Sequence, residues 1–71
     1  MEQNIRTLAT ALLKSNLELD YTLCYTYSMH VSPATRANVA AVKELIRDLH
    51  LDNLRVRRWD FETIRVEVTE C

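Results

Sequence analysis

Arginine and tryptophan side chains concentrate near the end of the chain, at Arg55, Arg57, Trp59 and Arg65. A guanidinium group offers a planar set of donors to carboxylates and phosphates, and it also stacks on aromatic rings. Trp and Arg are enriched among the residues that dominate binding energy at protein interfaces. We therefore interpret these four residues, called the Arg–Trp patch below, as the candidate partner-binding site.

The Arg–Trp patch forms only if residues 54–68 fold as a hairpin in one register. With a three-residue loop at 60–62, the inward-facing residues pair as Leu54–Val68, Val56–Val66 and Arg58–Ile64. A four-residue loop would mix apolar and charged residues on both faces, so the shorter loop is preferred.

The same register places Arg57 across from Arg65 on the opposite face, and Arg55 across from Glu67. Because facing like charges repel, this face suits an anionic or aromatic partner better than plain solvent. The alternative is a solvated strand face whose Trp59 is covered by the chain's own loop.

A second group of polar residues surrounds the start of a predicted helix over 33–50. The group consists of His30, Ser32, Thr35 and Arg36. Helix amino ends attract anions, and the first turn here carries Arg36 instead of an acidic residue. These residues are a candidate site for a phosphate or carboxylate. The alternative is ordinary capping by Ser32 ahead of Pro33, with Arg36 solvated.

The odd-numbered residues between 21 and 31 are aromatic or aliphatic, whereas most even-numbered ones are polar. This alternation predicts one strand over 21–31 with a single buried face. That face carries Tyr21, Tyr25 and Tyr27 together with Leu23 and Met29. A stripe that includes Leu and Met favours packing against a helix, although tyrosines on a sheet also serve as stacking platforms for single-stranded nucleic acid.

Two further segments, 3–16 and 33–50, show the apolar spacing of amphipathic helices. The predicted order of elements is therefore α-β-α-β-β. We expect an α+β fold in which two helices cover one face of a small three-stranded sheet. The first strand would join the hairpin by a parallel, right-handed crossover. A chain of 71 residues is expected to form one domain, 1–71.

The sequence offers little for catalysis or for a cofactor. It contains no glycine, which excludes the Gly-rich loops of Walker and dinucleotide sites and leaves positive-φ turns to Asn or Asp. In an extended strand Cys24 and His30 lie about 20 Å apart, too far for a nucleophile–base pair. No zinc-ligand spacing is present. We therefore expect no enzyme activity, no catalytic residue, no metal and no cofactor.

Composition is that of an ordinary globular chain, and a net charge of −1 gives no general attraction to nucleic acid or acidic membranes. The longest apolar runs have four residues, far below the roughly twenty that span a bilayer. The first residues lack a secretory pattern, and Cys24 and Cys71 allow at most one disulfide. We expect a cytoplasmic protein with free thiols and no membrane association.

A chain this small has a marginal core, and open sheet edges invite pairing. We therefore expect a homodimer. The strand that holds Ile64, Val66 and Val68 is a candidate to pair with its twin across a two-fold axis.

Three functions fit these features. The first is a small non-enzymatic regulatory or inhibitory protein that binds a protein partner through the Arg–Trp patch, such as a viral or mobile-element accessory factor. The second is a nucleic-acid-binding module that uses the same patch with Arg36, against which the near-neutral charge and the two lysines argue. The third is a dimer that sequesters a small anionic ligand or nucleotide at the start of the second helix.

Overall fold

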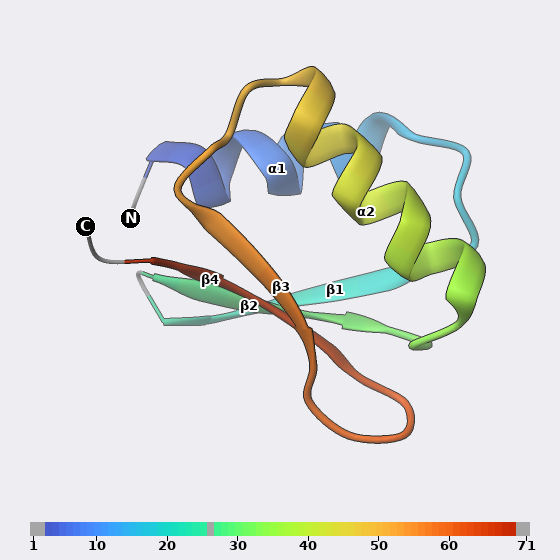
Figure 1. The fold of residues 1–71 in the computed structure, drawn as a ribbon. Helices are drawn as coiled ribbons and strands as arrows, with labels where there is room; N and C mark the ends of the chain where they lie inside the picture. The colour runs from blue at the N-terminus through green and yellow to red at the C-terminus, as the bar shows by residue number, and fades with distance from the viewer. Residues whose placement is uncertain (1–2, 26, 70–71) are drawn as a thin grey trace.

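The computed structural model describes residues 3–25 and 27–69 as two helices and a four-stranded antiparallel sheet. The elements are α1 (Gln3–Lys14), β1 (Asp20–Tyr25), β2 (Ser28–Ser32), α2 (Arg36–Asp48), β3 (Leu54–Arg58) and β4 (Ile64–Val68). The strand order is β1-β2-β4-β3, and both helices lie on one face of the sheet (Figure 1). The α+β class is confirmed, whereas the expected three-stranded sheet is wrong.

The extra strand arises because the segment predicted as one strand over 21–31 folds back on itself. β1 and β2 form a hairpin in which Tyr21 pairs with Val31 and Leu23 with Met29. Odd-numbered residues thus pair with odd-numbered residues as far as Leu23 and Met29, so most of the alternation matches that of a single strand. Residue 26, which belongs to the predicted strand, lies outside the described residues. No Gly, Pro, Asn or Asp marks the reversal, so the usual turn signal was missing.

The expected parallel crossover is also wrong, because β4 lies between β2 and β3. β4 pairs antiparallel with both neighbours, placing Val66 beside Met29 and Ile64 beside Val31. β4, which faces the helices with Ile64, Val66 and Val68, takes an interior position, and the arginine-rich β3 takes an edge. A central strand has no free edge, so β4 cannot pair with its twin as expected.

The core lies between the helices and the inner face of the sheet. Its largest fully buried apolar side chains come from both layers: Ile5, Leu8, Met29, Val31, Val42, Ile64 and Val66. α1 ends two residues before its predicted limit. α2 begins later than predicted, since Thr35 rather than Ser32 is its N-cap, and the Thr35 Oγ1 accepts a hydrogen bond from the Asn38 N–H at 3.1 Å. Ser32 is still the last residue of β2, which leaves it unavailable as a cap.

α2 ends at Asp48 with Leu49 as its C-cap, and the next residue, His50, is left-handed, with φ of 56°. The His50 N–H donates to the Arg47 carbonyl and the Leu51 N–H to the Ile46 carbonyl, which satisfies two of the last helical carbonyls. Glycine is the usual residue at this position, and the chain has none. The expectation that Asn or Asp would take the positive φ is wrong here. The residue that follows the C-cap is His50, and Asp52 and Asn53 come later in the chain.

Candidate partner-binding site on the open sheet face

The sheet face opposite the helices carries no covering element among the described residues (Figure 1). The hairpin register predicted for β3 and β4 is confirmed, with Val56 opposite Val66 and Arg57 opposite Arg65. The same register extends into β2, where His30 lies beside Arg65. Strand pairing therefore gathers side chains from β2, β3 and β4 on one exposed surface.

Glu67 lies at the centre of this surface and joins two arginines. Its Oε1 lies 3.2 Å from the Arg57 Nε, and its Oε2 accepts a hydrogen bond of 3.0 Å from the Arg65 Nε. The expected cross-strand ion pair between Arg55 and Glu67 is replaced by this diagonal arrangement, although the two residues do face each other in the register. The predicted repulsion between Arg57 and Arg65 is thereby offset by one shared carboxylate.

The electrostatics of Glu67 follow from these contacts. The hydrogen bond from Arg65 holds the pKa of the Glu67 carboxyl below its ordinary value, and the charges of Arg57, Arg65 and Arg55 act in the same direction. The carboxylate therefore remains ionised at neutral pH and keeps both guanidinium groups in place.

Trp59 packs against the same guanidinium groups. The Cζ atoms of Arg65 and Arg57 lie 4.8 Å and 5.4 Å from the centre of the indole ring. The centres of the His30 and Trp59 rings lie 5.3 Å apart. The Arg65 Nη1 donates toward the His30 Nε2 at 3.3 Å. Trp59 is nevertheless 50% exposed. About half of the side chain is therefore open to a partner, contrary to the alternative in which a loop covers it.

The structure thus brings together three residues of the Arg–Trp patch, and adds two that the sequence did not assign to it. The additions are Glu67, which the predicted register already placed on this face across from Arg55, and His30, which was assigned to the candidate anion site. Arg55 lies on the same face and is exposed. Three guanidinium groups against one carboxylate leave this surface with an excess of positive charge and with terminal Arg57 nitrogens that no described side chain holds.

The four residues of the candidate anion site lie in different surroundings. His30 contacts Trp59 and Arg65 on the open face, Ser32 pairs with Asp20 in the sheet, and Thr35 caps α2. Arg36 lines a cavity between α2 and β3. The grouping of these residues around one anion stays a prediction.

The tyrosine stripe divides at the turn between β1 and β2. Tyr21 packs against the core, as predicted. Tyr25 and Tyr27 are exposed, at 74% and 64%, so the prediction of a buried stripe is wrong for both. The reason is a β-bulge between Leu23 and Tyr25, which shifts the register just before the chain reverses.

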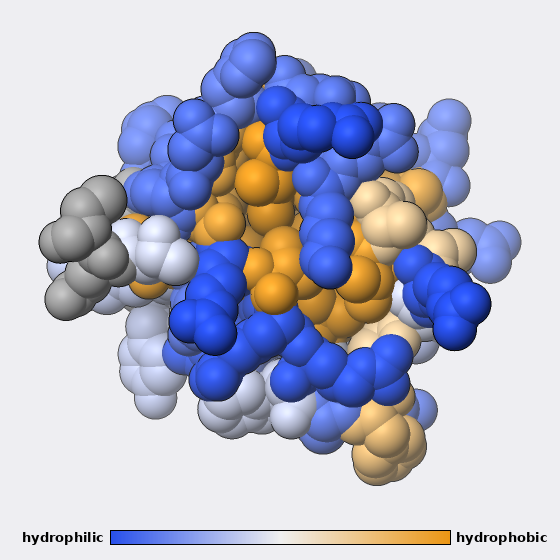
Figure 2. Space-filling view, in the orientation of Figure 1, coloured by the Kyte–Doolittle hydropathy of each residue, from blue (hydrophilic) through white to orange (hydrophobic). Residues whose placement is uncertain are grey.

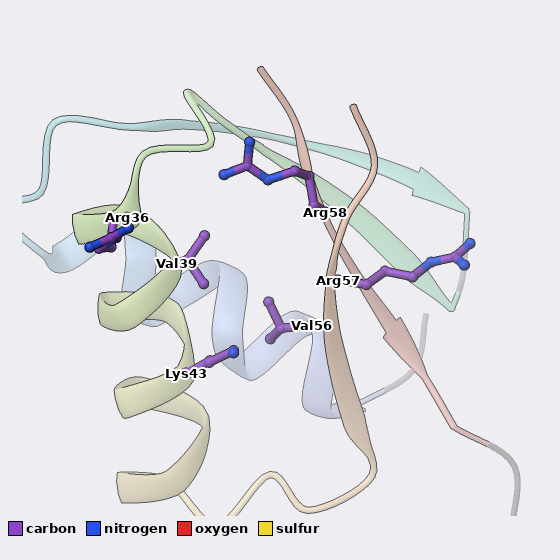
Figure 3. Close-up of a pocket in the computed structure, with 6 residues that line it drawn as sticks. All are labelled: Arg36, Val39, Lys43, Val56, Arg57 and Arg58. Atoms are coloured by element: carbon purple, nitrogen blue, oxygen red, sulfur yellow. The ribbon is translucent and has the colours of Figure 1, made fainter. Parts of the chain in front are cut away.

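A cavity of about 290 Å³ opens between α2 and β3, and sequence reasoning did not find it. Its lining residues are Arg36, Val39, Lys43, Val56, Arg57 and Arg58. Figure 3 shows the side chains of Val39 and Lys43 directed from α2 toward Val56, while the Arg57 side chain extends away. Figure 2 shows apolar surface in this region, framed by hydrophilic residues.

Arg58 belongs to the inner face of β3 and fixes one end of this cavity. Its Nη2 donates a 3.1 Å hydrogen bond to the Ala34 carbonyl, in the segment that leads into α2. The same segment is held by the buried Asn38, whose Nδ2 donates to the Pro33 carbonyl at 2.9 Å. The amino end of α2 is therefore tied to the edge strand.

No family of known proteins, no curated protein sequence and no solved structure matches this chain. Within residues 3–25 and 27–69, no cluster of three or more His, Cys, Asp or Glu side chains is placed to hold a metal ion. Neither helix in this part of the chain has the length and apolar character needed to traverse a bilayer.

Proposed function

We propose that this chain is a small regulatory or inhibitory protein that acts by binding a protein partner through the open sheet face. The observation that carries the proposal is the fixed arrangement of Arg57, Arg65 and Trp59 around Glu67. Side chains that already hold one another lose little conformational entropy when a partner binds. An acidic residue of the partner would take the terminal nitrogens of Arg57, and an apolar one would pack on Trp59.

A protein partner is favoured over nucleic acid by the charges around Trp59. A nucleic-acid strand could stack a base on the exposed part of the indole, as an apolar side chain of a protein could, so the acidic groups nearby decide between the two partners. The phosphates of the strand would meet the carboxylate of Glu67 at the centre of the surface, and those of Asp60 and Glu62 on the adjoining loop. A nucleic-acid strand carries a negative charge at every phosphate, whereas a protein partner can place a single acidic residue at Arg57.

Capture of the partner from host lysate tests this proposal, with Trp59→Ala compared with Phe61→Ala. Phe61 is a matched control, because it is an aromatic residue 83% exposed in the neighbouring loop. We expect Trp59→Ala to reduce the captured partner about tenfold or more and Phe61→Ala to leave it near the wild-type amount. Both variants should melt within a few degrees of the wild type.

The same capture, repeated after nuclease treatment, separates the two partner classes. A nuclease-resistant protein that Trp59→Ala no longer captures supports the proposal. Loss of the signal on nuclease treatment would favour the nucleic-acid alternative, and full capture by Trp59→Ala would remove the open face from consideration.

We further propose that the protein works in the cytoplasm and forms a homodimer. Because β4 is central, the sheet edges open to self-association are β1 and β3. Sedimentation at several concentrations checks the oligomeric state.

A further inference from the structure

The strand β3 forms one edge of the sheet, and its backbone pattern identifies which groups face outward. The Thr69 N–H donates to the Asn53 carbonyl at 2.7 Å, and the Trp59 N–H donates to the Thr63 carbonyl at 2.8 Å. Hydrogen bonding alternates along an antiparallel pair, so the odd-numbered residues from 53 to 59 bond to β4. The N–H and C=O groups of Val56 and Arg58 therefore point away from β4, toward the open edge.

This edge borders the cavity between α2 and β3. Val39 of α2 and Val56 of β3 are half-buried apolar residues that line it, and Arg58 closes one end through its hydrogen bond to the Ala34 carbonyl. A peptide placed along β3 would face the outward N–H and C=O groups of Val56 and Arg58. Every second side chain of the peptide would lie over the apolar groove. Strand addition beside a helix is a recurrent mode of peptide recognition.

The charges around the groove specify the kind of chain that fits. Four of its six lining residues are cationic: Arg36, Lys43, Arg57 and Arg58. Arg55, exposed on the open face, adds a further positive charge to the same strand. Because successive side chains of a strand point to opposite faces, acidic ones suit the open face beside Arg55 and Arg57. Short aliphatic ones suit the groove side, in contact with Val39 and Val56.

We propose that β3 binds an extended acidic segment of a protein partner as a fifth strand, with alternate aliphatic side chains in the groove between α2 and β3. This inference rests on the proposed function and names the form in which the partner is recognised. The N–H and C=O groups of Val56 and Arg58 pair with the segment's backbone. Its acidic side chains reach Arg57 and Arg55 on the open face.

A second copy of this chain is a poorer occupant of the same edge. Two β3 strands brought together would face Arg55, Arg57 and Arg58 of one copy with the same residues of the other. Facing like charges destabilise strand pairing, whereas an acidic segment removes that repulsion.

The experiment uses a synthetic peptide with four Val-Glu repeats, blocked at both ends, and a Val-Lys peptide of equal length. Binding is measured by fluorescence anisotropy, and amide hydrogen exchange is followed by NMR on the full chain. We expect the Val-Glu peptide to bind and to slow exchange of the Val56 and Arg58 amides several-fold, with little change at the interior strand β4. The Val-Lys peptide should not bind.

A charge-reversing variant on the edge strand gives the decisive contrast. Arg55→Glu should weaken the Val-Glu peptide about tenfold, whereas Lys14→Glu, a charge reversal on the exposed end of α1, should alter it less than twofold. The inference is overturned by absence of binding, by equal binding of the Val-Lys peptide, by unchanged exchange at Val56 and Arg58, or by equal effects of the two charge-reversing variants. Capture of a protein partner that needs Trp59 but tolerates Arg55→Glu would leave the proposed function standing and remove only the strand addition.

Discussion

The two hairpins of this sheet are built from similar alternating patterns but differ on their outer faces. In β1–β2, the outer residues are mostly neutral, and Tyr25 and Tyr27 extend into solvent at its turn. In β3–β4, Glu67 joins Arg57 and Arg65, and both guanidinium groups lie against Trp59. Exposed aromatic rings are present in both, and among the described residues it is Trp59 of the second hairpin whose ring contacts guanidinium groups. That difference is why the β3–β4 face is the stronger candidate for specific recognition.

The largest expected difference between the hairpins is their contribution to the core. Ile64 in β4 is fully buried, at 0% exposure, whereas Leu23 in β1 is 39% exposed. Ile64→Ala should destabilise the fold by about 3 kcal/mol through lost burial and an unfilled cavity. Leu23→Ala should cost about 1 kcal/mol or less, because much of its side chain is already in water. Urea denaturation followed by circular dichroism measures both, and equal losses would contradict the central place of β4.

The next effect concerns one acidic strand residue in each hairpin, Glu67 in β4 and Asp20 in β1. Glu67→Gln removes the charge shared by Arg57 and Arg65 and leaves those two arginines facing each other. We expect a loss of about 1 kcal/mol, which lowers the melting temperature by about 5 °C in a domain of this size. Asp20→Asn on the exposed edge strand β1 is the control and should shift melting by no more than a degree or two. Similar shifts for the two variants would show that Glu67 is an ordinary surface charge.

The pH dependence of the free energy of unfolding, compared between the wild type and Glu67→Gln, sharpens this contrast. Because the folded pKa of the Glu67 carboxyl is depressed by the Arg65 hydrogen bond and the nearby arginines, its contribution is fully present above the unfolded value of about 4.3. That contribution is lost as pH falls through the folded pKa, where the carboxyl becomes protonated in both states. The stability gap between wild type and Glu67→Gln should therefore be largest near neutral pH and shrink below about pH 4. A gap that stays constant down to pH 3 would rule out the ionised carboxylate as its source.

Much of the β3–β4 hairpin was predictable because its two faces differ sharply in chemistry. Only one register puts Val56 opposite Val66 and keeps Arg57 opposite Arg65, and that register is the observed one. The role of Glu67 was harder to predict, since a carboxylate across from Arg55 reaches Arg57 diagonally and Arg65 along its own strand. Such choices depend on side-chain rotamers and on the position of Trp59, which alternation does not encode.

The β1–β2 hairpin was missed for a physical reason. From Tyr21 with Val31 to Leu23 with Met29, its pairing joins residues of equal parity, so a turn leaves most of the alternation intact. A single strand and a hairpin then produce the same pattern of apolar residues, and the turn lacks the Gly, Pro, Asn or Asp that would separate them. Because this hairpin was read as one strand, the place of β4 between β2 and β3 was not predicted either. The cavity beside α2 was also not predicted, because it is created by the three-dimensional packing of α2 against β3.

The smallest expected effect concerns the segments that lead into the two hairpins. The chain enters β3 through His50 in the left-handed region, at φ of 56°, where a Cβ atom costs about 1 kcal/mol relative to glycine. His50→Gly should therefore raise the free energy of unfolding by roughly 0.5 to 1 kcal/mol, because glycine adopts this conformation without a steric penalty. Asn16→Gly, in the segment before β1, should give no gain, because Asn16 is not in a positive-φ conformation and glycine there only adds freedom to the unfolded chain. Thermal unfolding of both variants checks the pair, and a gain at position 16 that equals the gain at position 50 would show that backbone strain at the helix end is not the cause.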